Sequence, residues 1–314
     1  MNKLLLAALV TGALAQPVFA QDYTIMAPAA PGGGWDQTAR TIQQVLQDEG
    51  IAGNVQVTNV PGAGGTIGLA QFVNQAQGNP SQLIVGGYVM VGAILTNQSP
   101  VTLDNVTPIA RLTGESVAVV VPANSPIQTI DDLTAALKEN PGAVSWAGGS
   151  AGGADHILAG LYAQAVGVDP TQINYIAFSG GGEALAAILG GQVTVGVSGY
   201  GEFASQVEAG ELRLLAISGQ NRLEGVDAPT LSEAGVDVVL ENWRMVAAAP
   251  GITPEQEAEI NADIAAMVES DGWQTALADR GWVDTYLAGD EFKAQLAEDI
   301  AATDGILRQI GLVQ

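Results

Sequence analysis

The sequence has no cysteine and a single histidine, and only 10 lysines and arginines stand against 33 aspartates and glutamates. Without cysteine the chain can form no disulfide framework and carries no lipid-anchored N-terminal cysteine. The net charge of −23 excludes general nucleic-acid binding, which needs a basic surface, and argues against adhesion to an anionic membrane. We interpret the acidity as a source of solubility rather than as the mark of a partner.

The absence of cysteine and the single histidine also limit the metal and cofactor sites that the chain can form. A zinc site would need a shell made mostly of carboxylates, and no Asp or Glu cluster has the spacing of an EF-hand or a two-histidine site. Gly62 and Gly64 fit the first two places of a dinucleotide-binding fingerprint, but the third falls on Ile67. The phosphate-loop motif does not occur in the sequence. We therefore expect no metal and no cofactor.

The first 20 residues have the pattern of a secretory signal peptide. Lys3 supplies a positive start, Leu4–Leu14 is apolar, and small residues precede a cleavage site near Ala20. The apolar segment is too short to span a bilayer, and no later stretch reaches about 18 uninterrupted apolar residues. We expect a mature chain that begins near Gln21 and is exported, without an anchor, to a bacterial periplasm.

What the sequence has in quantity is glycine, and much of it lies in a repeated unit of strand, glycine-rich loop and helix. The unit occurs at 31–36, 61–66, 148–154 and 178–184, and a fifth strand end lies at 198–200. Strands that alternate with helices at this spacing predict parallel βαβ units and an α/β fold. In open α/β sheets, ligands bind at the carboxyl ends of the strands.

A bare loop that leads into a helix N-terminus can receive an anion, because unpaired N–H groups and the positive end of the helix dipole coincide there. Two domains that face each other would bring the four loops into one cleft. The chain as a whole repels anions, so binding must come from local dipoles and hydrogen bonds. We therefore predict a cleft that holds a small carboxylate.

Gly148-x-Ser150-x-Gly152 has the spacing of the nucleophile elbow of serine hydrolases. A hydrolase also needs a histidine base, and the single histidine, His156, lies in the helix that the elbow would start. Its ring would not turn back to the serine hydroxyl. We expect Ser150 to hydrogen-bond a ligand and His156 to pack or hydrogen-bond on a helix face. A serine hydrolase that uses Ser150 remains the alternative.

Several stretches resemble the substrate-binding proteins of tripartite tricarboxylate transporters, the TctC/Bug family. They are Pro31-Gly-Gly-Gly-Trp-Asp36 with Ala39-Arg40, Asn59-Val-Pro-Gly-Ala-Gly-Gly-Thr-Ile-Gly68, and Phe178-Ser-Gly-Gly-Gly-Glu-Ala184 with Leu189-Gly-Gly191. The resemblance covers essentially the whole mature chain. The Gly-Gly-Gly-Trp-Asp form is most similar to the tricarboxylate (citrate) receptor branch.

This resemblance implies a two-lobed periplasmic binding protein of the type II, Venus-flytrap kind, with two strands that cross between the lobes. It implies a monomer that captures a small di- or tricarboxylate, similar to citrate, and performs no catalysis. The receptor would deliver its ligand to the large and small membrane subunits of the transporter. A carboxylate-sensing receptor with the same cleft and no transport role is a further alternative.

In the family, backbone N–H groups and ordered water at the first two loops hold one ligand carboxylate, and the second lobe adds its own contacts. Many relatives carry Thr-Pro before the helix of the third loop, where this chain has Gly153-Ala154. The expected ligand-binding residues are Gly33, Gly34, Trp35, Gly64, Gly65, Thr66, Tyr88, Ser150, Ala151, Gly152, Phe178, Ser179, Gly180 and Ser198.

We expect one lobe to contain about residues 21–118 and 245–314, and the other about 119–244. The predicted hinge strands are Val117–Val121 and Trp243–Ala247. Closure of the lobes would be a population shift that the ligand drives. Arg244, beside the second hinge strand, is the one cation that we single out as a possible partner of the ligand.

Overall fold

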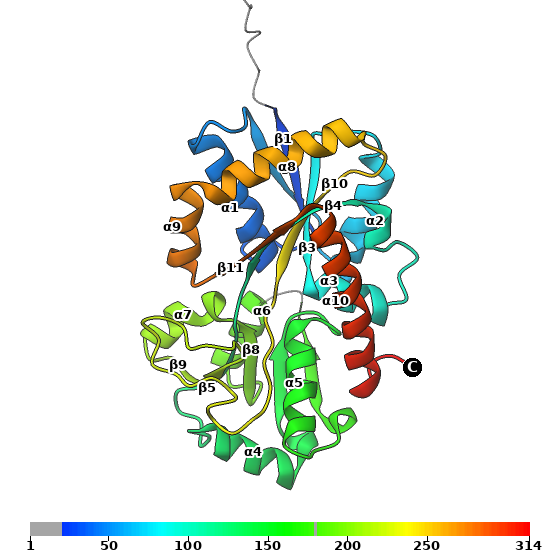
Figure 1. Cartoon of the computed structure of the whole chain (residues 1–314). Coiled ribbons are helices and arrows are strands. Elements are labelled where there is room, and N and C mark those ends of the chain that lie inside the picture. The colour runs from blue at the N-terminus through cyan, green and yellow to red at the C-terminus, as the bar shows by residue number, and fades with distance from the viewer. Residues whose placement is uncertain (1–20, 179–180) are drawn as a thin grey trace, which may run out of the picture.

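Two lobes, each built around one β-sheet, make up the structure, a computed structural model that describes residues 21–178 and 181–314 (Figure 1). The first lobe, at the top of Figure 1, has a six-stranded sheet of order β11-β4-β10-β3-β1-β2. The second lobe has a five-stranded sheet of order β7-β6-β8-β5-β9. The predicted two-lobed α/β fold is therefore confirmed. The predicted signal peptide lies outside the described residues.

The first lobe places three parallel strands side by side, and the loops that follow them emerge at one edge. Strand β10 pairs antiparallel with β3 and β4, and β11 pairs antiparallel with β4 at the edge of the sheet. The strands are β1 (Tyr23–Ala27), β2 (Val55–Asn59), β3 (Gln82–Gly87), β4 (Thr107–Gly114), β10 (Arg244–Ala248) and β11 (Val283–Ala288). The α-helices are α1 (Gly34–Asp48), α2 (Thr66–Gln75), α3 (Tyr88–Thr96), α8 (Pro254–Glu269), α9 (Asp271–Arg280) and α10 (Gly289–Gln309).

The second lobe repeats this plan, with β6 parallel to β7 and β8, and with β5 antiparallel to β8 and β9. Its strands are β5 (Val117–Pro122), β6 (Ser145–Gly148), β7 (Asn174–Ala177), β8 (Val195–Gly199) and β9 (Leu212–Ile217). Its α-helices are α4 (Ile130–Glu139), α5 (Ala154–Ala165), α6 (Gly181–Leu189) and α7 (Tyr200–Glu208).

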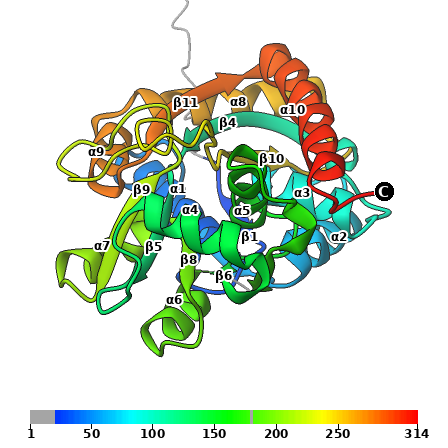
Figure 2. The same ribbon diagram turned by 90° about the horizontal axis from the view of Figure 1, so that it is seen from below.

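Both faces of the second sheet are covered, which explains the unbroken apolar run of β5. Val117, Val119 and Val121 point into the core shared with α4 and α5, whereas Ala118 and Val120 face the core shared with α6 and α7. Seen from below, these two helix pairs lie apart from each other (Figure 2). A strand buried on both faces is apolar at every position rather than at alternate ones.

The chain crosses between the lobes twice, at 115–116 and at 241–243, where Ser116 and Glu241 form an isolated antiparallel bridge. The strands predicted as hinges lie on either side of this crossing. Strand β5 belongs wholly to the second sheet, and β10 belongs wholly to the first. The crossing is therefore a short pair of extended segments rather than a pair of long strands.

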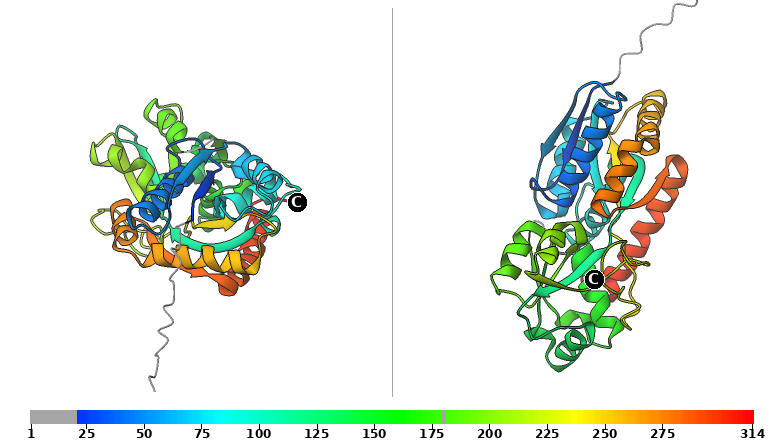
Figure 3. Two further views of the ribbon diagram at one scale, coloured as in Figure 1. Left: turned by 90° about the horizontal axis from the view of Figure 1, so that it is seen from above. Right: turned by 90° about the vertical axis from the view of Figure 1, so that its left-hand side faces the viewer.

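The end of the chain also joins the two lobes. Helix α10 begins in the first lobe and runs beside the second (Figures 1 and 3). Ile310 packs on α5, where a Cβ on Gly160 would come within 2.9 Å of Ile310 Cδ1. Gly311 also packs closely on the second lobe, because a Cβ on this glycine would lie 2.5 Å from Thr171 Cγ2. The last residues are thus in contact with the lobe opposite to the one that carries most of α10.

Helix starts follow the local signals of the sequence. Thr253 caps α8 by accepting the N–H of Gln256, whose side chain accepts the N–H of Thr253, and Pro254 takes the first helical position. By contrast, α1 begins at Gly34 with no side-chain cap, so its first N–H groups depend on other partners. Within the described residues, no helix combines the length and apolar character that a membrane crossing requires.

Candidate functional site

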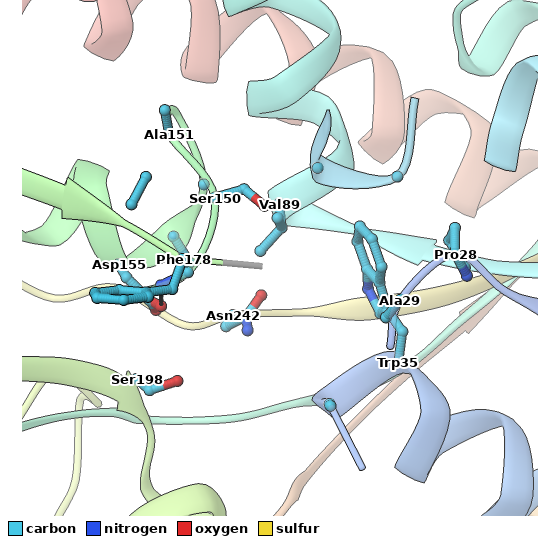
Figure 4. A pocket seen from close by; sticks show the side chains of 18 of the residues that line it. Pro28, Ala29, Trp35, Val89, Ser150, Ala151, Asp155, Phe178, Ser198 and Asn242 are labelled. Atoms are coloured by element: carbon cyan, nitrogen blue, oxygen red, sulfur yellow. Dashed lines mark hydrogen bonds between the residues drawn. The ribbon is translucent and has the colours of Figure 1, made fainter. Parts of the chain in front are cut away.

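A cavity of about 400 Å³ lies between the lobes, at the carboxyl ends of the parallel strands (Figure 4). Both lobes and the second crossing segment contribute to it. The wall includes Pro28, Ala29, Gly33, Gly34, Trp35, Gly62, Ala63, Gly64, Gly65, Val89, Asn97 and, at the start of β10, Arg244 from the first lobe, Gly149, Ser150, Ala151, Gly153, Ala154, Asp155, Ala177, Phe178, Glu183, Ser198, Gly199 and Glu202 from the second, and Asn242 from the crossing.

The four predicted glycine loops therefore meet in one place. Of the expected ligand-binding residues, nine line the cavity: Gly33, Gly34, Trp35, Gly64, Gly65, Ser150, Ala151, Phe178 and Ser198. Ser179 and Gly180 lie outside the described residues. Thr66, Tyr88 and Gly152 are not part of the wall. The clustering supports the expected site, and contact with a ligand stays a prediction for the residues that line it.

Local geometry explains why three of the expected residues face elsewhere. The Thr66 hydroxyl donates to the Ala63 carbonyl at 2.9 Å and is buried. The Tyr88 ring is also buried, with its centroid 6.3 Å from that of Trp243. Gly152 has φ +75°, and a Cβ there would lie 2.5 Å from Thr96 Cγ2, so this residue turns its free side towards α3. These three residues hold the loops in place beneath the cavity.

The two loops of the first lobe are packed on each other through Trp35. A Cβ on Gly65 would come within 2.7 Å of Trp35 Cζ3, and Gly65 also has φ +89°. Only glycine permits both the left-handed backbone and this close approach of the indole ring. Across the cavity, a Cβ on Gly64 would lie 3.6 Å from Ser150 Cβ. The loops of the two lobes therefore face each other at a short distance.

An aspartate in the first turn of α1 holds the first loop. Asp36 accepts hydrogen bonds from the Gly32 N–H at 2.8 Å, from Arg40 Nε at 3.0 Å and from Asn59 Nδ2 at 2.8 Å. Burial alone would raise the pKa of Asp36, but the bonds from Arg40, Gly32 and Asn59 together lower it. The Asp36 carboxylate thus belongs to the scaffold of the loop.

Asp155 has the corresponding place in the second lobe, in the first turn of α5. Its Oδ2 accepts the Gly149 N–H at 2.7 Å. Burial raises the pKa of Asp155 to about 7, because the bond from Gly149 offsets only part of the desolvation and the nearby carboxylates of Glu202 and Glu115 act in the same direction. Unlike Asp36, this carboxyl group lines the cavity.

His156 supports the third loop rather than activating Ser150. Its Nδ1 accepts the Gly152 N–H at 3.2 Å, and its ring stacks on Tyr175 with the centroids 4.0 Å apart. The Tyr175 hydroxyl donates to the Gly149 carbonyl at 2.9 Å. Burial lowers the pKa of His156 to about 4, so the ring is neutral at physiological pH. This geometry agrees with the predicted packing role and does not form a nucleophile–base pair.

Charged side chains gather at one end of the cavity, where the crossing segment meets α1 and α7. Arg244 forms a buried ion pair with Glu115, and its Cζ lies 5.2 Å from the ring centroid of Trp282. The Ser198 hydroxyl donates to Glu202 Oε2 at 2.5 Å, and Glu202 also accepts the N–H of Gly34 at the start of α1. Burial, and then the charge of Glu115, raise the pKa of Glu202.

Sequence reasoning singled out Arg244 but missed Glu115, Asp155, Glu202 and Asn242. In a chain with 33 acidic residues, single carboxylates carry little signal. Asp155 and Glu202 do share one feature that could have identified them, because each lies in the first helical turn after a glycine-containing loop at a strand end. That position in a parallel sheet faces the site where ligands bind.

The chain matches the family described as the tripartite tricarboxylate transporter family receptor over residues 38–312. It is 28% identical to protein BugT of Bordetella pertussis over 311 residues, which cover 96% of this chain and 94% of that protein. The fold is similar to the structure of the periplasmic binding protein BugD, with a TM-score of 0.83 and 20% identity over 93% of this chain and 98% of that one.

MatC from Rhodopseudomonas palustris, solved with bound malate, is similar at a TM-score of 0.78. It is 25% identical to this chain, and the similarity covers 93% of this chain and 100% of that one.

Proposed function

The chain belongs to the tripartite tricarboxylate transporter receptor family, and from this membership we propose that it captures a small di- or tricarboxylate, similar to citrate, in the cavity between its lobes. The ligand is held and released without chemical change. We further propose that the receptor is a monomer that acts in the periplasm after cleavage near Ala20. It delivers its ligand to the large and small membrane subunits of such a transporter.

The observation that carries this proposal is the convergence of glycine loops from both lobes on one cavity. Gly33, Gly64 and Gly149 bring backbone without a side chain to the cavity wall, and helices α1, α2 and α5 begin within a few residues of them. A carboxylate at such loops can accept several charge-assisted hydrogen bonds, each contributing roughly 1.5–3 kcal/mol. The bound malate of MatC supports a ligand of this size and charge.

A thermal-shift screen of the mature protein tests the proposal. The panel would contain citrate, malate, succinate, aromatic acids, neutral sugars and simple cations. A ligand at about 100 times its dissociation constant should stabilise the folded state by about 2.7 kcal/mol. We expect a response to at least one di- or tricarboxylate and none to the sugars. A response confined to sugars or cations would refute the proposed function.

Delivery to a transporter needs its own test. The purified receptor, saturated with the acid found in the screen, would be added to vesicles that contain the two membrane subunits. We expect uptake of the labelled acid only when the receptor is present. Binding without any receptor-dependent uptake would instead support the carboxylate-sensing role.

A further inference from the structure

The start of α1, where the sequence predicts N–H groups without helical partners, is in contact with the second lobe. The N-cap residue, Gly33, has no side chain that could cap the helix. The N–H of Gly34 donates instead to Glu202, which lies in the first turn of α7. A carboxylate is favourable there, because it accepts a hydrogen bond and faces the positive end of the helix dipole. One lobe therefore supplies the helix, and the other supplies its cap, which we call the inter-lobe cap.

The second lobe holds the Glu202 carboxylate in position for this contact. The hydroxyl of Ser198, near the end of β8, donates to Glu202 Oε2 at 2.5 Å. Ser198 is buried, and both residues belong to the same strand-to-helix turn of the second lobe. This bond can therefore persist when the lobes separate. The carboxylate is already oriented when the lobes meet, so that ordering it costs little free energy.

Close backbone packing surrounds the inter-lobe cap. A Cβ on Gly34 would overlap the guanidinium of Arg244, which lies at the start of β10. A Cβ on Gly201 would lie 3.4 Å from Glu115 Oε1 and 3.6 Å from the carbonyl oxygen of Arg280, the last residue of α9. The starts of α1 and α7 therefore approach the buried pair of Glu115 and Arg244 from opposite lobes.

The inter-lobe cap and the contact between the second and third glycine loops lie on different sides of the cavity. A Cβ on Gly64 would lie 3.6 Å from Ser150 Cβ, so these loops face each other closely. Figure 4 shows Ser198, which orients Glu202, on the opposite side of Asn242 from Ser150. The lobes thus meet on both sides of Asn242, and the inter-lobe cap must break for the cavity to open on its side.

We propose that Glu202 stabilises the closed arrangement of the lobes before a ligand binds, by capping α1 from the opposite lobe. This inference goes beyond the proposed function, because it concerns the receptor without ligand and is independent of the ligand's identity. On opening, water replaces the partners of the Gly34 N–H and of the carboxylate, so the net effect is modest. A charge-assisted hydrogen bond of this kind should change the ratio of closed to open molecules by about tenfold.

A ligand carboxylate could instead compete with Glu202 for the Gly34 N–H, which the sequence predicts as part of the ligand site. The two roles have opposite consequences. If Glu202 stabilises closure, its removal weakens ligand binding, because fewer molecules have the binding-competent arrangement. If Glu202 blocks the ligand, its removal strengthens binding. Gly64 and Ser150 line the cavity whether or not Glu202 caps α1, which favours the first role.

Distances between α1 and α7 in the ligand-free protein test the proposal. Spin labels are attached to the mature protein at Gln44→Cys in α1 and at Ala209→Cys just after α7, two exposed positions. Bound acids are removed beforehand by unfolding, dialysis and refolding. Glu202→Ala should lower the ratio of short to long distances by about tenfold. Glu202→Gln keeps an oxygen acceptor but loses the charge, and it should lower this ratio less.

Glu208→Ala is the matched control, because it removes an exposed carboxylate from the last turn of the same helix. It should leave the distances unchanged. Unchanged distances in both Glu202 variants, with thermal unfolding showing that both are folded, would overturn the proposal.

Calorimetric titration with malate and with citrate gives a second readout. An acid that binds the natural protein should bind Glu202→Ala more weakly, by up to about tenfold. Tighter binding by this variant would show that Glu202 competes with the ligand, and the proposal would then be wrong. The distance measurement needs no ligand, so it tests the role of Glu202 even if no carboxylate binds and the proposed function fails.

Discussion

Asp36 and Asp155 have the same place in two glycine loops, yet their surroundings move their pKa values in opposite directions. Asp36 has Arg40 at 3.0 Å, and its pKa is lowered. Asp155 is buried without such a partner, and its pKa is raised to about 7 from 3.8. Between pH 3.8 and about pH 7, the Asp155 carboxyl group is protonated in the folded state and ionised in the unfolded state. Ionised Asp155 therefore costs stability as the pH rises through this window.

Asp155→Asn should remove that cost. Asn keeps an oxygen that can accept the Gly149 N–H and never ionises. The free energy of unfolding of the variant, relative to the natural protein, should increase between about pH 4 and pH 7 and then level off. Urea unfolding at several pH values measures it. A difference that stays constant over this range would show that Asp155 is not neutral when the protein folds.

Asp36→Asn is the matched comparison, and its effect on the free energy of unfolding should have the opposite sign. The lowered pKa of Asp36 contributes stability that is present above the unfolded pKa and is lost as the pH falls through the folded value. The variant should be less stable than the natural protein near pH 7, by roughly 1–3 kcal/mol, because Arg40 and the Gly32 N–H lose a charged acceptor. The deficit should shrink on acidification.

The buried pair of Glu115 and Arg244 is a second test at the scale of residues. Both side chains are only 3% exposed. Glu115→Leu leaves a buried guanidinium without its counter-charge and should cost about 3–5 kcal/mol in unfolding free energy. Combining it with Arg244→Met removes the unpaired charge and should recover most of that loss. A double variant as unstable as the sum of the two single variants would contradict this explanation.

At the scale of elements, α3 and the third glycine loop are in direct backbone contact across the lobes. A Cβ on Gly92 would overlap the carbonyl oxygen of Gly152. Gly92→Ala should therefore push the lobes apart and weaken ligand binding by at least about tenfold, with an overpacking cost of roughly 1–3 kcal/mol. Calorimetric titration with the ligand measures the affinity. Gly305→Ala is the control, because nothing lies within 4 Å of its Cβ position in α10.

Elements whose sequence carries a local signal could be predicted, and those that depend on distant partners could not. The glycine loops are local features, so they could be predicted, and the cap at Thr253 is a local signal of the same kind. Strand β11 was not predicted, because its half-buried residues have no regular pattern and it is held by pairing with β4. Tyr88 was expected at the ligand, but the sequence does not reveal that its ring turns to Trp243.

The charged end of the cavity could not be predicted from the sequence for the same reason. Glu115 and Arg244 are 129 residues apart in the chain and meet only because the two crossing segments run side by side. The apolar or acidic type of a residue does not by itself predict such a long-range contact. Loop-to-helix junctions are different, because the first N–H groups of a helix lack a partner within the helix wherever the chain folds in this way. The backbone part of the site was therefore predictable, and its charged part was not.

For the molecule as a whole, the two crossing segments lie side by side, and the lobes are also joined by the Gly34 N–H of α1, which Glu202 of α7 accepts. The two crossing segments, the contact of α3 with the third loop, and the packing of Ile310 on α5 all join the lobes directly. Helices α1 and α6 start from loops of the cavity in opposite lobes. Opening should therefore increase the distance between these two helices more than the distance across the crossing.

We predict that ligand binding shortens the distance between α1 and α6 in solution. The sequence contains no cysteine, so Gln44→Cys and Ala186→Cys give two unique labelling sites, both exposed. Spin labels at these positions should show a broad distance distribution without ligand and a narrower, shorter one at saturation, because the ligand favours the closed population. The pair Gln44→Cys and Asn74→Cys lies within the first lobe and should not change. An unchanged distance between the lobes, under conditions where thermal stabilisation proves saturation, would mean that the ligand enters a cavity that is already closed.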